Sequence, residues 1–130
     1  MAQTPAPPSS SEPRARRVIE AYGDGGFRIG GEIYRGSILV VPDGAQAWPI
    51  TAVADLTVDS LAPILAVEPV PAILLIGCGK GAALIPPALR QALRAKGVVI
   101  DAMDTGAACR TYNVLLSEER RVAAALIAVE

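Results

Sequence analysis

Two short apolar runs, Ala72–Ile76 and Val98–Ala102, most constrain what this chain can fold into. Apolar runs of this length are typical of strands buried on both faces of a sheet. The segment between them begins a helix at the Pro86-Pro87 pair, repeats leucine at helical spacing, and reaches a stop at Gly97. A strand, a helix and a second strand in this order predict two parallel strands joined by a crossover helix.

The sequence after the second run predicts another helix and a last strand. Asp104 or Thr105 can cap a helix that runs to about Glu118. The alanine-rich tail from Val122 to Val129 is compatible with either helix or strand. We expect a strand there, partly because of the family resemblance described below.

From Val18 to Trp48, short apolar pieces alternate with glycine-rich turn signals. Glycine accepts the positive φ angles of tight hairpin turns, so this region predicts a β-meander. Trp48 is expected to pack against the next layer, with ligand stacking as the alternative. Thr57 can cap a short helix that Pro63 should restrict or distort. The residues therefore predict an α/β chain in which a β-meander precedes a parallel strand pair with its crossover helix.

The chain of 130 residues fits one domain, which we expect to span residues 18–130. Residues 1–17 are rich in Pro, Ser and Ala, lack a hydrophobic period, and predict a disordered leader. The leader ends in three arginines, expected to be a solvated hinge, with a polyanion-binding arm as the alternative. It has neither the basic start and apolar stretch of a signal peptide nor the composition of a transit peptide, so we expect a cytoplasmic protein.

Composition excludes several functional classes. Twelve basic and thirteen acidic residues leave a net charge of −1, which provides no electrostatic footprint for nucleic acid. No apolar run reaches the ~18 residues that a transmembrane helix needs. The chain has no histidine, and Cys78 and Cys109 lie far apart, so we expect no metal or other cofactor and two free thiols.

The segment Met103–Leu115 concentrates the polar side chains of an otherwise apolar region. On a helix, Arg110, Asn113 and Ser117 would share one face, and Tyr112 would lie on the other with alanine and leucine. One interpretation is a polar network that locks the helix onto the strand ends. The other is a ligand pocket at the carboxyl ends of the two central strands, where open α/β sheets usually bind ligands.

The glycine-rich loop after the first central strand, Gly77–Gly81, also fits the start of a dinucleotide-binding fingerprint. That fingerprint needs a helix that opens at the glycines, whereas here the helix begins near Pro86. A close backbone approach therefore explains the glycines better, and an anion nest assisted by Lys80 remains a further alternative. Cys78 could be a reactive thiol beside Lys80, but an inert thiol is favoured because no histidine can activate it.

Asp104–Leu115 followed by Glu118–Leu126 resembles the closing signature of the Mth-type domain family. The Gly30-Gly31 turn, the Trp48 segment and Ile73–Gly79 also resemble this family. The family includes bacterial and archaeal stand-alone proteins, an adipogenesis-associated protein and a mitochondrial assembly factor of NADH:ubiquinone oxidoreductase. The resemblance implies a three-layer α/β fold, with a mixed central sheet, crossover helices and an adjoining N-terminal β-meander. It implies no established catalytic residue, metal or cofactor. For the mitochondrial members it implies assembly of respiratory complex I through protein partners.

Two functional hypotheses follow. The favoured one is a non-catalytic interaction or assembly factor with a protein partner, possessing no catalytic residues and able to self-associate. The alternative is a binding protein or enzyme for an anionic metabolite, held by Lys80, Arg110 and loop amides. Both use one predicted binding site, which comprises Gly77, Cys78, Gly79, Lys80, Met103, Asp104, Thr105, Arg110, Tyr112 and Asn113.

Overall fold

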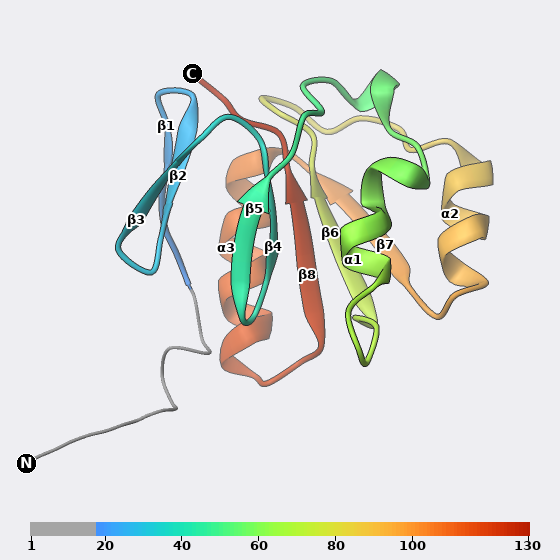
Figure 1. Cartoon of the computed structure of the whole chain (residues 1–130). Coiled ribbons are helices and arrows are strands. Elements are labelled where there is room, and N and C mark those ends of the chain that lie inside the picture. The colour runs from blue at the N-terminus through green and yellow to red at the C-terminus, as the bar shows by residue number, and fades with distance from the viewer. Residues whose placement is uncertain (1–17) are drawn as a thin grey trace, which may run out of the picture.

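The computed structural model describes residues 18–130, so the predicted leader, residues 1–17, lies outside the described residues. The described chain forms two sheets (Figure 1). The smaller sheet is antiparallel and contains β1 (Ile19–Gly23), β2 (Gly26–Ile29) and β3 (Glu32–Arg35). The larger sheet has the strand order β5-β4-β8-β6-β7 and comprises β4 (Ile38–Val41), β5 (Gly44–Ala47), β6 (Ile73–Gly77), β7 (Val99–Met103) and β8 (Val122–Leu126).

The larger sheet is mixed, as predicted. Strand β6 pairs in parallel with both β7 and β8, whereas β4 pairs antiparallel with β5 and β8. Helix α2 (Pro87–Arg94) connects β6 to β7, and α3 (Thr105–Ser117) connects β7 to β8. The predicted crossover unit and the strand assignment of the tail are therefore confirmed.

Helices and the small sheet cover the two faces of the larger sheet. Helix α3 and the small sheet lie on one face, and α1 (Ala62–Leu65) and α2 lie on the other (Figure 1). Because side chains alternate along a strand, Leu74 and Ile76 of β6 face α2 while Leu75 faces α3. The fully buried alanines of β8 add little bulk, which lets both layers approach this central strand.

The predicted meander is divided between the two sheets. Its last hairpin, β4–β5, joins the larger sheet because β4 pairs with β8. The sequence Ile-Leu-Val-Val of β4 lacks a polar face, which suits a strand with neighbours on both sides. The break falls at Gly36, whose φ of +81° turns the chain. At Ser37, the hydroxyl oxygen accepts the Ala128 N–H (3.0 Å) and fixes the start of β4 beside the end of β8.

The segment between β5 and β6 contains only short helices. Two 3-10 turns, Val53–Asp55 and Asp59–Leu61, precede α1. The Thr57 hydroxyl oxygen accepts the Ser60 N–H (3.0 Å) and holds the start of the second turn, although the residue that directly precedes this turn is Val58 rather than the predicted Thr57. Trp48 is buried against the segment and donates its indole N–H to the Ser60 carbonyl (2.8 Å), which confirms its predicted packing role. Among residues 18–130, no helix is both long enough and apolar enough to cross a membrane.

Candidate functional site

The structure brings six of the predicted site residues together at the carboxyl ends of β6 and β7. Gly77 ends β6, and Cys78 and Gly79 follow it; Met103 ends β7, and Asp104 and Thr105 begin α3. The two segments are joined by backbone hydrogen bonds. The Cys78 N–H donates to the Met103 carbonyl (2.8 Å), and the Thr105 N–H donates to the Gly79 carbonyl (2.9 Å).

Thr105 is the centre of this cluster. It is fully buried, and its hydroxyl donates to the Ile127 carbonyl (2.7 Å) and accepts the Gly79 N–H (2.9 Å). One side chain thus connects the ends of β6 and β8 to the start of α3. Gly77 permits this approach, because an added Cβ would lie 3.0 Å from the Thr105 Cα and 3.0 Å from its hydroxyl oxygen. The close backbone approach expected for this glycine-rich loop is present.

Asp104 and Met103 also have structural contacts. The Asp104 carboxylate accepts the Ala107 N–H (2.8 Å), so the aspartate is the N-cap of α3. The Met103 sulfur accepts the Thr111 hydroxyl at 3.6 Å. In the loop after β6, the amides of Cys78 and Gly79 are already bonded within the fold. They are therefore not available as a nest for an anion.

The two cationic residues of the predicted site are exposed. Lys80 lies in the loop after β6, and Arg110 lies on the outward face of α3. A Cβ on Gly106 would meet the Tyr22 hydroxyl and would lie 3.4 Å from an Arg110 nitrogen. The glycine therefore leaves space on the first turn of α3, where Tyr22 of β1 packs beside Arg110. Tyr22 was not predicted as a site residue, and no motif in the sequence distinguishes it from the other tyrosines.

Asn113 lies away from this cluster and holds β1 against α3. Its amide nitrogen donates to the Ile19 carbonyl (2.9 Å), and its amide oxygen accepts the Ile19 N–H (2.8 Å). This pair of bonds satisfies the backbone of β1 as a neighbouring strand would. The predicted polar network exists for Asn113, but its partner is the small sheet rather than the ends of the central strands.

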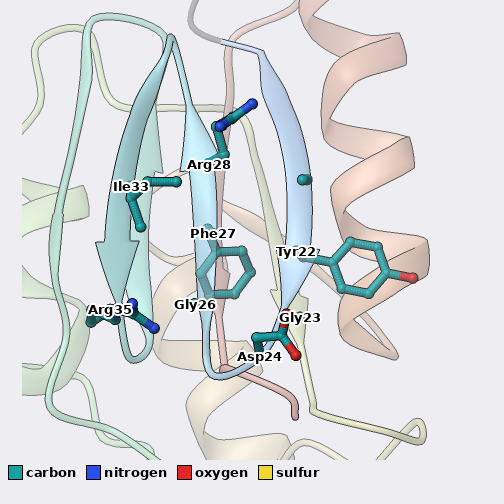
Figure 2. Close-up of a pocket in the computed structure, with 9 residues that line it drawn as sticks. Tyr22, Gly23, Asp24, Gly26, Phe27, Arg28, Ile33 and Arg35 are labelled. Carbon is teal, nitrogen blue, oxygen red and sulfur yellow. The ribbon is translucent and has the colours of Figure 1, made fainter.

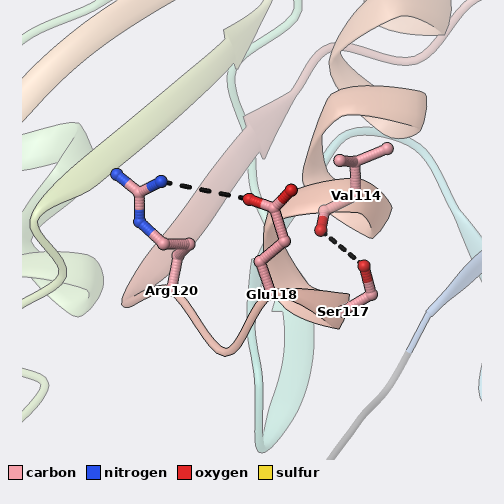
Figure 3. Close-up of polar contacts among 4 residues, drawn as sticks. All are labelled: Val114, Ser117, Glu118 and Arg120. Atoms are coloured by element: carbon pink, nitrogen blue, oxygen red, sulfur yellow. Dashed lines mark hydrogen bonds and ion pairs between the residues drawn. The ribbon is translucent and has the colours of Figure 1, made fainter.

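Ser117 shares the face of Asn113 and begins the turn from α3 to β8 (Figure 3). Its exposed hydroxyl donates to the Val114 carbonyl one turn earlier (2.6 Å). In the same turn, Glu118 and Arg120 form an exposed ion pair at 4.0 Å. An exposed pair of this kind contributes little to stability. These contacts close the end of α3 and lie at the opposite end of the helix from Asp104.

Tyr112 is buried in the core between α3 and the larger sheet. Burial raises the pKa of its phenol, and the negative charge of Asp43 raises it further. Among residues 18–130, its hydroxyl has no hydrogen-bond partner. A buried hydroxyl without a partner loses its hydration without compensation.

We therefore expect Tyr112→Phe to keep or increase the stability of the protein, with a gain of up to about 1 kcal/mol. The replacement keeps the ring and removes only the unpaired hydroxyl. Urea unfolding measures the effect, and Tyr112→Leu is the matched control because it removes ring volume and should cost about 2 kcal/mol. A loss above 1 kcal/mol in Tyr112→Phe would mean that the hydroxyl has a partner in solution.

The two cysteines differ in their surroundings. Both are free thiols; Cys78 is half-buried and its thiol points to the Ile76 carbonyl (3.7 Å). Cys109 is buried in α3, as predicted, and burial raises its pKa to about 12; the Arg110 charge lowers it and the Asp104 charge raises it to a smaller extent. Because the thiolate is the nucleophile, Cys109 should be unreactive near neutral pH.

We predict that one thiol per native molecule, Cys78, reacts with Ellman's reagent at pH 8, and that both react after unfolding. In the folded protein, Cys109 stays protonated until the pH approaches its raised pKa of about 12. The variant Cys78→Ala should therefore show almost no reaction until it unfolds, whereas Cys109→Ala should react like the wild type. Rapid modification of native Cys78→Ala would contradict the buried environment of Cys109.

Three hollows on the described part of the chain are lined by residues outside the predicted site, so none of the ten predicted site residues borders these three. The first lies on the outer face of the small sheet (Figure 2). The other two adjoin the β4–β5 hairpin and share Val41, Asp43 and Val67. Of these three, the first has two arginines in its lining, Arg28 and Arg35, neither of which belongs to the predicted site.

The larger sheet is the central layer of the domain, with α3 and the small sheet on one side and α1 and α2 on the other. This arrangement defines a three-layer α/β domain of the Mth938-like class. A solution structure from Bordetella pertussis described as a Mth938-like domain is 31% identical, has a TM-score of 0.78, and matches 91% of this chain and 89% of its own. Residues 19–127 match the family described as protein of unknown function (DUF498/DUF598), and the chain belongs to this family.

Two further relatives bear on function. NADH dehydrogenase [ubiquinone] 1 alpha subcomplex assembly factor 3 from Xenopus tropicalis is 36% identical over 84% of this chain. The match covers 60% of that factor, so the chain spans less than two thirds of its length. A crystal structure described as an outer membrane protein from Bartonella henselae is 43% identical, with a TM-score of 0.82, and matches 88% of this chain and 97% of its own.

Proposed function

We propose that this chain is a non-catalytic assembly factor that binds a protein subunit of a respiratory membrane complex while that complex forms. The family relationship supports the class, because curated relatives are named as assembly factors of NADH dehydrogenase. Both cysteines are free thiols, which is consistent with a reducing compartment, and we propose the bacterial cytoplasm as the location.

The observation that carries the proposal is that most polar side chains of Met103–Asn113 are bonded within the fold or buried. Asp104, Thr105 and Asn113 direct their polar atoms to backbone groups of the same chain, as the distances above show. Cys109 and Tyr112 are buried, and burial raises the pKa of each. Side chains that are already bonded, or buried in protonated form, are better suited to hold a surface in shape than to move protons.

The surface that these residues support has the character of a protein interface. Leu84 in the β6–α2 loop is 86% exposed, and Tyr22 is 44% exposed beside Arg110. The loop after β6, the β1–β2 turn and the start of α3 lie along one edge of the molecule (Figure 1). Aromatic and arginine side chains, such as those of Tyr22 and Arg110, are enriched at interface centres. We name Tyr22, Lys80, Leu84 and Arg110 the interaction edge.

Cross-linked pull-down from the source cells tests this proposal with Leu84→Glu and Arg110→Ala. Both positions are exposed, so each variant should fold with the melting temperature of the wild type. We expect the wild type to capture NADH dehydrogenase subunits or assembly proteins, and Leu84→Glu to lose most of this capture. Val99→Glu is the matched control, because Val99 is 50% exposed and begins β7, at the end of the sheet opposite to the loop after β6 and the start of α3.

If Leu84→Glu captured the same proteins as the wild type in equal amounts, the interaction edge would not be the binding surface for the partner. Specific retention of an anionic metabolite, lost in Arg110→Ala without loss of any protein, would instead support the metabolite-binding alternative. The small-molecule fraction is therefore analysed by mass spectrometry beside the proteins.

A further inference from the structure

The hollow on the outer face of the small sheet has a volume of about 310 Å³ (Figure 2). Strand register explains which residues form it. Ala21, Arg28 and Ile33 are paired across the three strands, and Gly23, Gly26 and Arg35 form the next row. Side chains two residues apart point to the same side of a strand, so both rows share this face. Phe27 and Ile29 lie in the alternate positions and are buried in the core, and Phe27 also borders the hollow.

The backbone fixes the shape of the hollow. Gly26 can carry no side chain, because an added Cβ would collide with the Tyr34 carbonyl of β3. Gly23 has a φ of +124°, which side-chain-bearing residues rarely adopt. Two neighbouring positions of the outer face are thus without side chains, and the depression between the arginines is a permanent feature of the sheet.

The floor of the hollow is apolar and open to solvent. Ile33 is 59% exposed at its centre, and Ala21 and the two glycines contribute no polar side chain. Tyr22 lines the hollow and packs on Gly106 of α3, so the hollow adjoins the interaction edge. Clusters of exposed apolar residues bordered by polar groups commonly mark binding surfaces.

The two arginines that line the hollow favour a negatively charged ligand. Arg28 and Arg35 lie toward opposite ends of the hollow, with Ile33 between them, and Asp24 is the one acid in the lining (Figure 2). Within residues 18–130, neither arginine forms an ion pair or a hydrogen bond through its side chain. The register separates their Cα atoms by roughly 8 Å, and the long side chains extend this span. A complementary ligand is apolar in its centre and anionic at both ends.

We propose that this hollow binds a short extended segment of a protein partner that carries an aliphatic side chain between two carboxylates. In an extended segment, residues two apart lie about 7 Å from each other on one side. Acidic residues two positions before and after the aliphatic residue are then about 14 Å apart, and they reach both arginines when the long arginine side chains extend outward from the two ends of the hollow. This inference rests on the proposed function for its source of ligand, since an assembly factor must recognise a protein, but the peptide-binding property can be tested on the isolated protein.

The test is selection from a displayed library of random seven-residue peptides against the full chain. Arg28→Gln/Arg35→Gln is the counter-target, and Arg94→Gln, an exposed arginine on α2, is the matched control. We expect enriched peptides with Asp or Glu on both sides of Leu, Ile or Val. They should bind the wild type and Arg94→Gln equally and the double variant about tenfold more weakly, as two exposed ion pairs predict. Ile33→Ser should weaken binding while both arginines remain.

Two outcomes would overturn the proposal: selection of no peptide above background, or of peptides that the double variant binds as tightly as the wild type. Sedimentation with vesicles containing phosphatidylglycerol is run in parallel. If vesicles bind in an arginine-dependent way and no peptide is enriched, the hollow recognises anionic lipid and the proposal is wrong. A failed selection combined with successful capture of complex subunits through the interaction edge would remove this inference and leave the proposed function standing.

Discussion

Replacing Thr105 with valine is expected to lower the free energy of unfolding by about 2–4 kcal/mol. Valine has nearly the shape of threonine but has no hydroxyl, so the Ile127 carbonyl and the Gly79 N–H both lose their partner. The site is fully buried, and water cannot replace these bonds without a rearrangement. Equilibrium unfolding in urea, followed by circular dichroism, measures the loss.

Thr111→Val is the matched control for this substitution. Thr111 lies on the same helix, is only half-buried, and its hydroxyl contacts only the Met103 sulfur at 3.6 Å. We expect it to cost less than about 0.5 kcal/mol, because sulfur is a weak acceptor. Thr105→Ser keeps the hydroxyl and should recover most of the stability lost in Thr105→Val. Equal unfolding midpoints for Thr105→Val and Thr111→Val would show that the hydroxyl does not join the strand ends.

Replacing Asn113 with leucine is expected to detach β1 from α3 and to lower the free energy of unfolding by about 1–3 kcal/mol. Leucine is similar in size, but it removes both bonds to the Ile19 backbone. Asn113→Asp should also destabilise the protein, because a carboxylate cannot donate to the Ile19 carbonyl. Hydrogen exchange followed by mass spectrometry should show faster exchange in β1 than in the wild type.

Ser117→Ala is the control for Asn113, because Ser117 lies one turn later on the same face and bonds only to the Val114 carbonyl of its own helix. It should leave the exchange of β1 unchanged. If Asn113→Leu also left the exchange of β1 unchanged, the small sheet would be held by its apolar face alone, through Phe27 and Ile29.

The local elements of the fold could be predicted because their signals are local. The apolar runs of β6 and β7, the proline start of α2 and the Asp104 cap of α3 are each contained within a few residues. The division of the meander could not be predicted, because the glycines show where the chain turns and not which strand pairs with which. The pairing of β4 with β8 joins segments more than 80 residues apart.

The site could be predicted only in part for the same reason. The concentration of polar residues between Met103 and Asn113 indicated an important segment, but it did not reveal the partners of these residues. Thr105 bonds to Ile127, and Asn113 bonds to Ile19 at a sequence separation of 94 residues. One feature of the sequence could indicate the hollow of the small sheet: Ile33, an isoleucine on the exposed face, lies between Arg28 and Arg35 of neighbouring strands. That signal becomes visible only once the register of β2 and β3 is known.

The most direct test of the assembly-factor proposal is the amount of intact NADH dehydrogenase complex in source cells that lack this protein. Native gel electrophoresis with an in-gel activity stain measures it, and immunoblots of single subunits confirm that they are still synthesised. We predict a marked loss of intact complex in the deletion strain. Expression of the wild-type chain should restore the complex, whereas expression of Leu84→Glu to the same protein level should not. A normal amount of active complex in the deletion strain would contradict the proposed function.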